Sequence, residues 1–177
     1  MGHTAPRGGF CLTVSGLVFA LDPTPKLLLH QHKRYQLLLP PGGHVEADEH
    51  PWTALLRELR EEAGIVPEQL AVLVPPDFVT GPGRFPAPVT LDVHEVEPGW
   101  THTDLGFAFV IDPPPRLAPG PGESLELHWL AVAEVVKDAG VPERIVELAG
   151  LLESQLAAWT RLPVTAIGLT PRPRLPG

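Results

Sequence analysis

The sequence has almost no cysteine and comparatively little positive charge, and each shortage excludes a class of protein. Cys11 is the single cysteine among the 177 residues, so an internal disulfide cannot form. The 13 lysines and arginines are outnumbered by 21 aspartates and glutamates, which gives a net charge of −8. This charge balance argues against non-specific binding to nucleic acid or to an anionic membrane surface.

Long apolar runs are also missing. No apolar stretch approaches the roughly 18 residues of a membrane span. The first residues, MGHTAPRGGF, lack the apolar segment of a signal peptide, so we expect a cytoplasmic protein. Hydrophobic residues make up 44% of the chain and charged residues 19%, as in soluble globular proteins.

Glycine and proline, by contrast, are abundant at 17 and 23 residues, but they cluster between segments with regular hydrophobic patterns. This distribution indicates a folded domain with stiff loops. The length suits one domain with a sizeable core. We therefore expect a single domain over residues 1–177, with a mobile start at 1–9 and a proline-rich tail at 163–177.

Runs of β-branched and apolar residues, bounded by turn residues, predict strands in several places. The predicted strands are residues 11–20, 26–32, 35–39, 70–74, 89–96, 103–112 and 125–132. In residues 89–96 the apolar side chains alternate with polar ones, which separates the two faces of a strand. Apolar residues at helical spacing predict a closing helix within residues 142–159.

The most informative stretch is GHVEADEHPWTALLRELREEAGI, residues 43–65. On a helix its apolar side chains follow the i, i+3, i+4, i+7 pattern of a face that packs on a core. That face consists of Trp52, Leu55, Leu56, Leu59 and Ala63. Glu58, Glu61 and Glu62 project from the other side and repel one another. A hard divalent cation with oxygen ligands suits the space between such carboxylates.

Residues around this helix have physical roles of their own. Gly43 and the preceding glycine can adopt backbone angles closed to other residues, which would turn a carbonyl toward a metal. The helix can begin at Asp48 or at the His50-Pro51 pair and end at Gly64 as a left-handed cap. Arg57 can hold a neighbouring carboxylate through a two-pronged hydrogen bond.

The spacing of the fixed residues in this stretch matches every position of the Nudix box. Those residues are Gly43, Glu49, Arg57-Glu58-Leu59, Glu61-Glu62 and Gly64-Ile65. The chain therefore resembles the Nudix hydrolase family. The resemblance implies an α/β fold, an α/β/α sandwich with a mixed central sheet. It also implies metal-dependent cleavage of a diphosphate bond in a nucleoside diphosphate linked to another group.

In this family the resemblance implies that Mg²⁺ or Mn²⁺ is bound by Glu58, Glu61 and Glu62, with the Gly43 carbonyl as a further ligand. We expect Arg57 to orient Glu58. The general base is expected to be Glu61 or a residue outside the box such as Asp104. Family members often add an acidic residue from outside the box, for which the candidates are Asp104, Glu123 and Glu126.

Further segments, PPGGHVE, LDVHEVEPG and HTD, resemble a bacterial branch of the family. This likeness nominates Asp104 and His102 for the active-site cleft. Phe85 and Trp100 could stack on a base, although aromatic residues in such loops usually anchor the loop.

His30 and His32 lie two residues apart on a predicted strand, so their side chains share one face. Together with His44 they could form a zinc site, with the remaining ligand from elsewhere in the chain. The alternative that we favour is contact with the substrate, for which His32, His44 and His102 are the candidates. A histidine that is merely solvated is the third reading.

Two other functions fit the same box. An isopentenyl diphosphate isomerase would use a cysteine and a glutamate near its substrate, but Cys11 lies in an early strand. A nucleotide-sensing Nudix module would bind without cleaving, although such modules tend to lose box glutamates and none is lost here. Homodimers are common in the family, but the sequence contains no feature that indicates one. It does not identify the nucleoside diphosphate derivative either.

Overall fold

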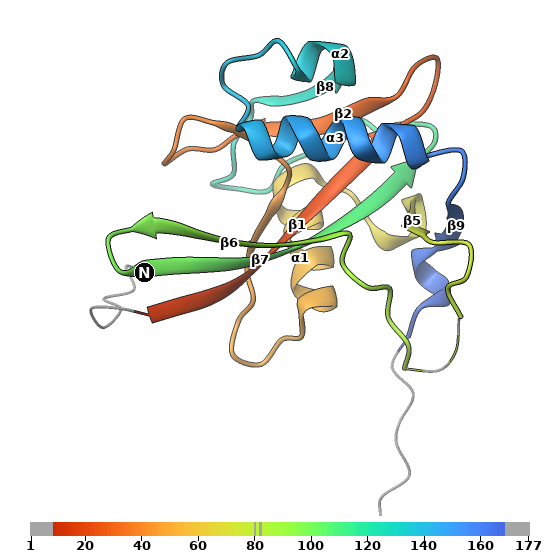
Figure 1. Ribbon diagram of the computed structural model, residues 1–177, viewed down its shortest axis with the longest axis horizontal. Helices are drawn as coiled ribbons and strands as arrows, with labels where there is room; N and C mark the ends of the chain where they lie inside the picture. The colour runs from red at the N-terminus through yellow and green to blue at the C-terminus, as the bar shows by residue number, and fades with distance from the viewer. Residues whose placement is uncertain (1–8, 80, 82, 169–177) are drawn as a thin grey trace, which may run out of the picture.

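The computed structural model describes residues 9–79, 81 and 83–168, which form a twisted mixed sheet with helices on both faces (Figure 1). The strands and α-helices, in chain order, are β1 (Gly9–Ala20), β2 (Lys26–Gln31), β3 (Leu38–Leu39), β4 (Gly42–His44), α1 (Pro51–Ala63), β5 (Leu70–Val74), β6 (Thr90–Glu97), β7 (Trp100–Ile111), β8 (Leu127–Ala131), α2 (Val132–Val135), α3 (Glu143–Gln155) and β9 (Thr160–Pro163). Short 3₁₀ helices follow α1 at Pro67–Gln69 and β9 at Val164–Ala166.

The centre of the sheet is the parallel pair of β1 and β7. Their register runs without interruption from Gly9 opposite Trp100 to Ala20 opposite Ile111. On its other edge β1 pairs antiparallel with β2 and β4. The outer edge of β7 pairs antiparallel with β6 in its first half and with β5 in its second half. The sheet is therefore mixed, as expected.

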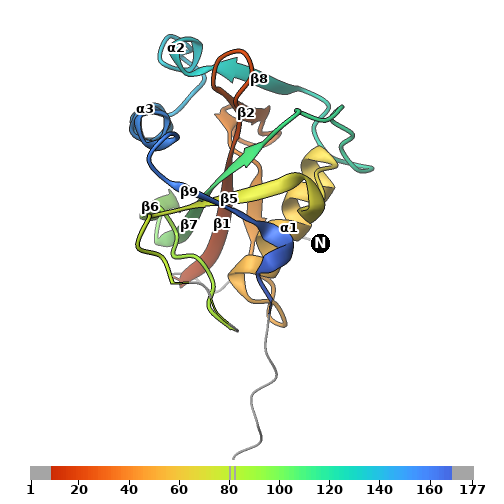
Figure 2. The same cartoon turned by 90° about the vertical axis from the view of Figure 1, so that its right-hand side faces the viewer.

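Alternate residues of the central strands face two separate hydrophobic cores. Val14 and Val18 of β1 pack with the apolar residues of α1, whereas Leu17 and Phe19 pack with those of α3. Figure 2 shows the result, with the sheet between α1 on one side and α3 on the other. Gly16 brings α1 close, because a Cβ at this position would lie 3.0 Å from Leu59. The expected α/β/α sandwich is confirmed.

Most predicted segments form the expected elements, and residues 35–39 are an exception. Only Leu38–Leu39 is a strand, because the preceding residues form the turn between β2 and β3. The His32 carbonyl accepts a hydrogen bond from the Gln36 amide, and Gln36 has a positive φ of 54°. Local turn geometry therefore overrides the apolar pattern.

Strand β6 alternates as the sequence predicts, but its apolar face is the one that points to solvent. Leu91 and Val93 are 61% and 63% exposed. Asp92 and His94 face the same side of the sheet as their β7 partners, Asp104 and His102. Alternation separates the two faces of a strand without showing which face is buried.

The chain after residue 160 contributes more to the fold than the sequence indicates. Strand β9 pairs antiparallel with β5, and Val164 is only 2% exposed. Val164 and Ile167 thus pack on the α1 core within the segment that we expected to be a tail, while 169–177 and residues 1–8 of the expected mobile start lie outside the described residues. Within the described part of the chain, no helix is both long and apolar enough to cross a membrane.

Candidate functional site

Local signals set both ends of α1, the helix that carries the glutamates. His50 is the N-cap, and its Nδ1 atom accepts a hydrogen bond from the Thr53 amide at 3.4 Å. Pro51 follows in the first turn, where its missing N–H removes no helical hydrogen bond. Gly64 ends the helix with a φ of 71°, a left-handed conformation that favours glycine.

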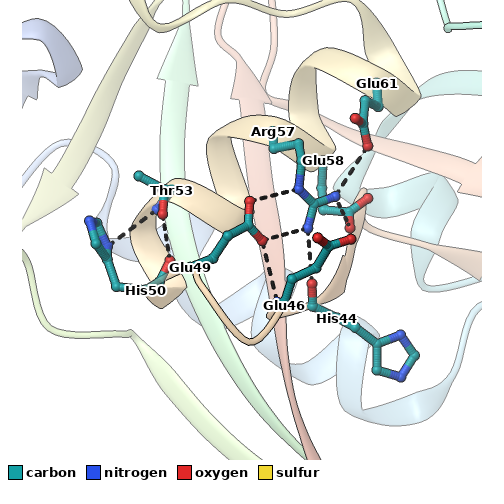
Figure 3. Close-up of polar contacts among 8 residues, drawn as sticks. All are labelled: His44, Glu46, Glu49, His50, Thr53, Arg57, Glu58 and Glu61. Atoms are coloured by element: carbon teal, nitrogen blue, oxygen red, sulfur yellow. Dashed lines mark hydrogen bonds and ion pairs between the residues drawn. The ribbon is translucent and has the colours of Figure 1, made fainter.

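Arg57 is the centre of the polar network on this helix (Figure 3). Its Nε and Nη2 atoms donate to the two oxygens of Glu49 at 2.8 and 2.9 Å. Its Nη1 atom donates to Glu58 at 2.7 Å and to Glu61 at 3.1 Å. The two-pronged hydrogen bond therefore goes to Glu49, and each of the other two carboxylates receives one bond.

These hydrogen bonds also favour the charged forms of Glu49 and Arg57. The bond from Arg57 is the main cause that lowers the pKa of Glu49, and the bond to Glu49 is the main cause that raises the pKa of Arg57. Arg57 Nη2 also donates to the His44 carbonyl at 3.0 Å. One guanidinium thus joins the helix to the end of β4, while the His44 imidazole points away from it (Figure 3).

The glycines of β4 matter because the glutamates approach them closely. The Glu58 carboxylate occupies the space that a Cβ on Gly43 would fill. The Gly42 amide donates to Glu62 Oε2 at 2.8 Å. Neither glycine is among the described residues with a positive φ, so the expectation of unusual backbone angles is wrong. Close packing explains glycine here.

Burial makes the negative charge of the site costly. The side chains of Glu58 and Glu62 are 14% and 11% exposed, whereas that of Glu61 is 51% exposed. Desolvation is the main cause that raises the pKa of Glu62 to about 8, against the hydrogen bond from Gly42, and the charge of Glu58 adds to the rise. Desolvation raises the pKa of Glu58 in the same way, while Arg57 opposes it.

These observations fit a divalent cation. Carboxylate and carbonyl oxygens are the donors that Mg²⁺ and Mn²⁺ prefer. Glu58 and Glu62 lie close enough for the charge of one to raise the pKa of the other, and an added positive charge would relieve that cost. Glu58 reaches the backbone of Gly43, whose carbonyl is the further ligand that the sequence nominates.

His30 is a neighbour of the glutamates that the sequence did not place there. Its Nδ1 atom lies 3.7 Å from Glu62 Oε1, and the residue is 4% exposed. Burial lowers the pKa of His30 to about 4, and the pKa of Glu62 is raised to about 8. Both shifts favour the neutral form, so burial disfavours an ion pair between His30 and Glu62 in the metal-free protein.

Glu123 is the acidic residue outside the box whose charge acts on the α1 glutamates. The loop before it is tied to the end of α1, since the Ala118 and Gly120 amides donate to the carbonyls of Ala63 and Glu61 at 3.0 and 2.6 Å. The Glu123 carboxylate is one cause of the raised pKa of both Glu58 and Glu62. The sequence had this residue only as one of three candidates.

Asp104 lies on the other face of the sheet. It is opposite Thr13 on β1, which shares its side of the strand with Leu17 of the α3 core. The Asp104 carboxylate accepts hydrogen bonds from Thr13 Oγ1 at 2.8 Å and from Ser15 Oγ at 2.7 Å. It is therefore held away from the α1 glutamates.

The histidines separate into two groups. In the turn after β2, His32 stacks on Tyr35 with ring centroids 4.6 Å apart. The ring centroid of His30 lies 6.0 Å from that of His32. His44 is instead in edge contact with His102, at 5.1 Å between ring centroids. The zinc site considered for His30, His32 and His44 is therefore not assembled, and His44 and His102 lie together on the Asp104 side.

The aromatic candidates for base stacking also have structural contacts. Phe85 packs against Trp52 and His50 at the start of α1, with ring centroids 6.0 and 5.3 Å away. A groove of about 370 Å³ lies there, lined by His50, Pro51, Trp52, Phe85, Leu105 and Phe107. Trp100 lies against Gly9, where a Cβ would collide with its ring.

Comparison with known proteins agrees with this geometry. The family model described as NUDIX domain matches residues 12–149. A NUDIX-family hydrolase from Clostridium perfringens superposes with a TM-score of 0.68 and 26% identity, covering 86% of this chain and 99% of its own. No curated protein matches the sequence.

Two further solved structures share the fold at lower identity. An Ap4A hydrolase from C. elegans, solved as a binary complex, has a TM-score of 0.67 and 20% identity, covering 83% of this chain and 98% of its own. The NUDIX domain of Shewanella oneidensis NrtR, complexed with ADP ribose, has a TM-score of 0.62 and 17% identity, covering 84% and 89%.

Proposed function

Because this chain belongs to the Nudix hydrolase family, enzymes that act on diphosphate bonds, we propose that it is a metal-dependent pyrophosphohydrolase of a nucleoside diphosphate linked to another group. The observation that carries the proposal is the close set of carboxylates on α1. Glu58 and Glu62 are held against β4, and the charge of Glu58 helps to raise the pKa of Glu62, which a bound cation would offset. The choice of nucleoside diphosphates is motivated by Ap4A and ADP ribose, named for two structures of this fold.

In this proposal Glu58, Glu61, Glu62 and the Gly43 carbonyl hold Mg²⁺ or Mn²⁺. When bound, such a cation neutralises phosphate oxygens and lowers the pKa of a coordinated water. Arg57 keeps Glu58 and Glu61 in place through its Nη1 atom, and the Gly42 amide keeps Glu62 in place. This fixed arrangement provides the orientation on which much of the rate of such a reaction depends.

The reaction itself needs a water and a base. Water attacks one phosphorus atom, a P–O bond forms, and the bridging P–O bond breaks to leave two phosphorylated products. A carboxylate accepts the proton of the water. Glu61 is the box residue for this role, since its half-exposed side chain can reach both solvent and the site. Glu123 is the candidate outside the box, because its charge acts on Glu58 and Glu62.

The position of Cys11 disfavours the isomerase alternative. Its strand partner is His102, on the Asp104 side of the sheet, so its thiol does not share a site with the α1 glutamates. Nucleotide sensing without cleavage stays as the other alternative, and the assay below distinguishes it by tight binding without turnover.

The experiment is a panel of nucleoside diphosphate derivatives incubated with enzyme and Mg²⁺. The panel contains ADP ribose, dinucleoside polyphosphates and nucleotide sugars, and the products are separated by chromatography. We expect at least one compound to yield two phosphorylated products, with EDTA abolishing turnover. Full turnover in EDTA after exhaustive dialysis, or binding without any cleavage across the panel, would overturn the proposal.

A further inference from the structure

Three potential soft-metal ligands lie together on the face of the sheet opposite the α1 glutamates. On the parallel pair, Cys11 of β1 is directly opposite His102 of β7. His44, the last residue of β4, is opposite Thr13, which shares the Cys11 face of β1. Since neighbouring strands present paired residues on the same side, the three side chains converge.

The distances agree with this convergence. One ligand atom each from Cys11, His44 and His102 lies within 4.8 Å of the other two. A fourth ring, His94 of β6, stands 5.6 Å from His102 between centroids. Its Nδ1 atom is buried and has no hydrogen-bond partner within the described residues. Two imidazoles and a thiol therefore lie together, beside an imidazole nitrogen that has no hydrogen-bond partner within the described residues. Such a set of electron-pair donors is suited to a metal cation.

We propose that Cys11, His44 and His102 form a second metal site, which binds Zn²⁺ and is separate from the glutamate site. Sulfur and imidazole nitrogen are the donors that Zn²⁺ favours, whereas Mg²⁺ favours oxygen. Three protein ligands leave a fourth position for His94 or for water. In a tetrahedral site, donor atoms are about 3.3–3.7 Å apart at ordinary Zn–N and Zn–S lengths, so rotations that move the donors by roughly 1 Å complete it.

The environment suits these ligands. An imidazole must be neutral to bind a metal, and burial and the neighbouring His44 lower the pKa of His102. The charges of Asp104 and Arg144 act on His102 in opposite directions. Burial raises the pKa of the Cys11 thiol, so binding replaces its proton, with one S–H bond broken, one S–Zn bond formed and one proton released to solvent.

A zinc ion here would stabilise β4, the short strand at the start of the box. Strand β4 is only three residues long and pairs with β1 alone among the described strands. His44 would be held twice, by zinc at its imidazole and by Arg57 at its carbonyl. The two metal sites would thus share β4 while using opposite faces of the sheet.

Co²⁺ is the probe for this site, because a thiolate ligand gives a charge-transfer band in the near ultraviolet that oxygen ligands do not give. The metal-free full-length protein is titrated with Co²⁺ in excess Mg²⁺, which occupies the carboxylates. We expect saturation at one equivalent with the thiolate band, and loss of the band on addition of Zn²⁺. Absence of the thiolate band would overturn the proposal.

Variants separate this site from the glutamates. Cys11→Ser and His102→Gln should abolish the thiolate band or weaken Co²⁺ binding at least about tenfold, together with the rise in Tm that Zn²⁺ gives the wild type. The matched control is His128→Gln, an exposed histidine on β8, which should bind as the wild type does. Glu62→Gln should also keep the band.

A band unchanged in Cys11→Ser would overturn the assignment. Equal loss in Glu62→Gln and in Cys11→Ser would also overturn it, because it would show a single site at the glutamates. Circular dichroism of each variant confirms folding before titration, so loss of binding is not confused with loss of structure. Failure of this proposal leaves the hydrolytic assay, which uses Mg²⁺ alone, unaffected.

Discussion

The carboxylate of Glu58 lies in the space that a Cβ atom on Gly43 would occupy. Gly43→Ala would therefore displace Glu58 or push β4 away from α1. Since misplacement of a catalytic group by about 1 Å can cost about a hundredfold, we expect turnover to fall at least about tenfold. Steady-state kinetics at saturating Mg²⁺ measure this.

Gly150→Ala is the matched control for that substitution. Gly150 lies in α3, exposed, with nothing near the position of a Cβ. Alanine there should leave turnover unchanged and stabilise the helix by about 0.5–1 kcal/mol. Wild-type turnover in Gly43→Ala would show that Glu58 does not need its observed position.

Arg57→Lys tests the network around the guanidinium. Lysine keeps the positive charge but cannot donate to Glu49, Glu58, Glu61 and the His44 carbonyl at once. We expect turnover to fall at least about tenfold, because Glu58 and Glu61 lose their orientation, and unfolding free energy to fall by about 1–3 kcal/mol. Urea denaturation and initial rates measure the two effects.

The control on the same helix is Arg60→Lys, since Arg60 is exposed and takes no part in the hydrogen bonds of Arg57. It should match the wild type in both measurements. If Arg57→Lys behaved like this control, the five hydrogen bonds of Arg57 would contribute neither to stability nor to the site.

The loop carboxylate Glu123 should act on metal binding, whereas Asp104 should not. Glu123→Gln removes a charge that acts on Glu58 and Glu62, so the Mg²⁺ concentration for half-maximal rate should rise at least about threefold. Asp104→Asn should leave that concentration unchanged and lower stability by about 1–2 kcal/mol, because it weakens the hydrogen bonds from Thr13 and Ser15. A higher Mg²⁺ requirement in Asp104→Asn but not in Glu123→Gln would show that Asp104, and not Glu123, acts on the metal site.

We expect the stability of the metal-free protein to depend on pH because of Glu62. The pKa of its carboxyl is raised to about 8 in the folded state, so folding takes up a proton between the ordinary glutamate pKa and that value. This contribution makes stability decrease as pH rises through this window and level off above it. His30, whose pKa is lowered to about 4, contributes in the opposite sense: its loss of stability comes as pH falls below the ordinary histidine value.

Melting in EDTA from about pH 5 to about pH 9 should therefore differ between the wild type and Glu62→Gln. The difference should favour the variant increasingly as pH rises, because the variant has no carboxyl to ionise while His30 is present in both. Parallel pH profiles would mean that Glu62 ionises in the folded protein as easily as in the unfolded chain.

The elements whose sequence signals are local have bounds closest to those predicted. Helix α1 spans Pro51–Ala63 with His50 and Gly64 as its caps, close to the predicted limits. Caps and periodic apolar residues act over a few positions, so short stretches of sequence are enough to identify them. The same holds for β5, whose observed bounds, Leu70–Val74, are those predicted.

What could not be predicted depends on pairing between distant segments. Asp104 and His102 were nominated for the glutamate cleft, but the parallel register of β1 and β7 places them on the α3 side, with Cys11 opposite His102. Backbone hydrogen bonds tie the proline-rich loop before Glu123 to the end of α1, and such bonds have no sequence pattern. In β6 the alternation indicated two faces, yet the polar one turned inward.

We propose that the glutamates of α1 serve a metal and not the core. A comparison of Glu62→Gln with Leu59→Ala tests this most directly. Glutamine keeps the size of the side chain and an oxygen for the Gly42 amide but removes the charge. Turnover should fall about a hundredfold or more, roughly 3 kcal/mol. In EDTA, Tm should stay the same or rise, because the variant no longer has a carboxyl whose ionisation is opposed by burial and by neighbouring charges.

Leu59→Ala should show the reverse, since Leu59 is fully buried in the α1 core. It should lose about 2–5 kcal/mol of stability and retain wild-type turnover well below its Tm. Turnover and metal-free melting of the two variants, measured side by side, decide the matter. If Glu62→Gln lowers the metal-free Tm as much as Leu59→Ala does and keeps its turnover, the carboxylates are structural and do not serve a metal.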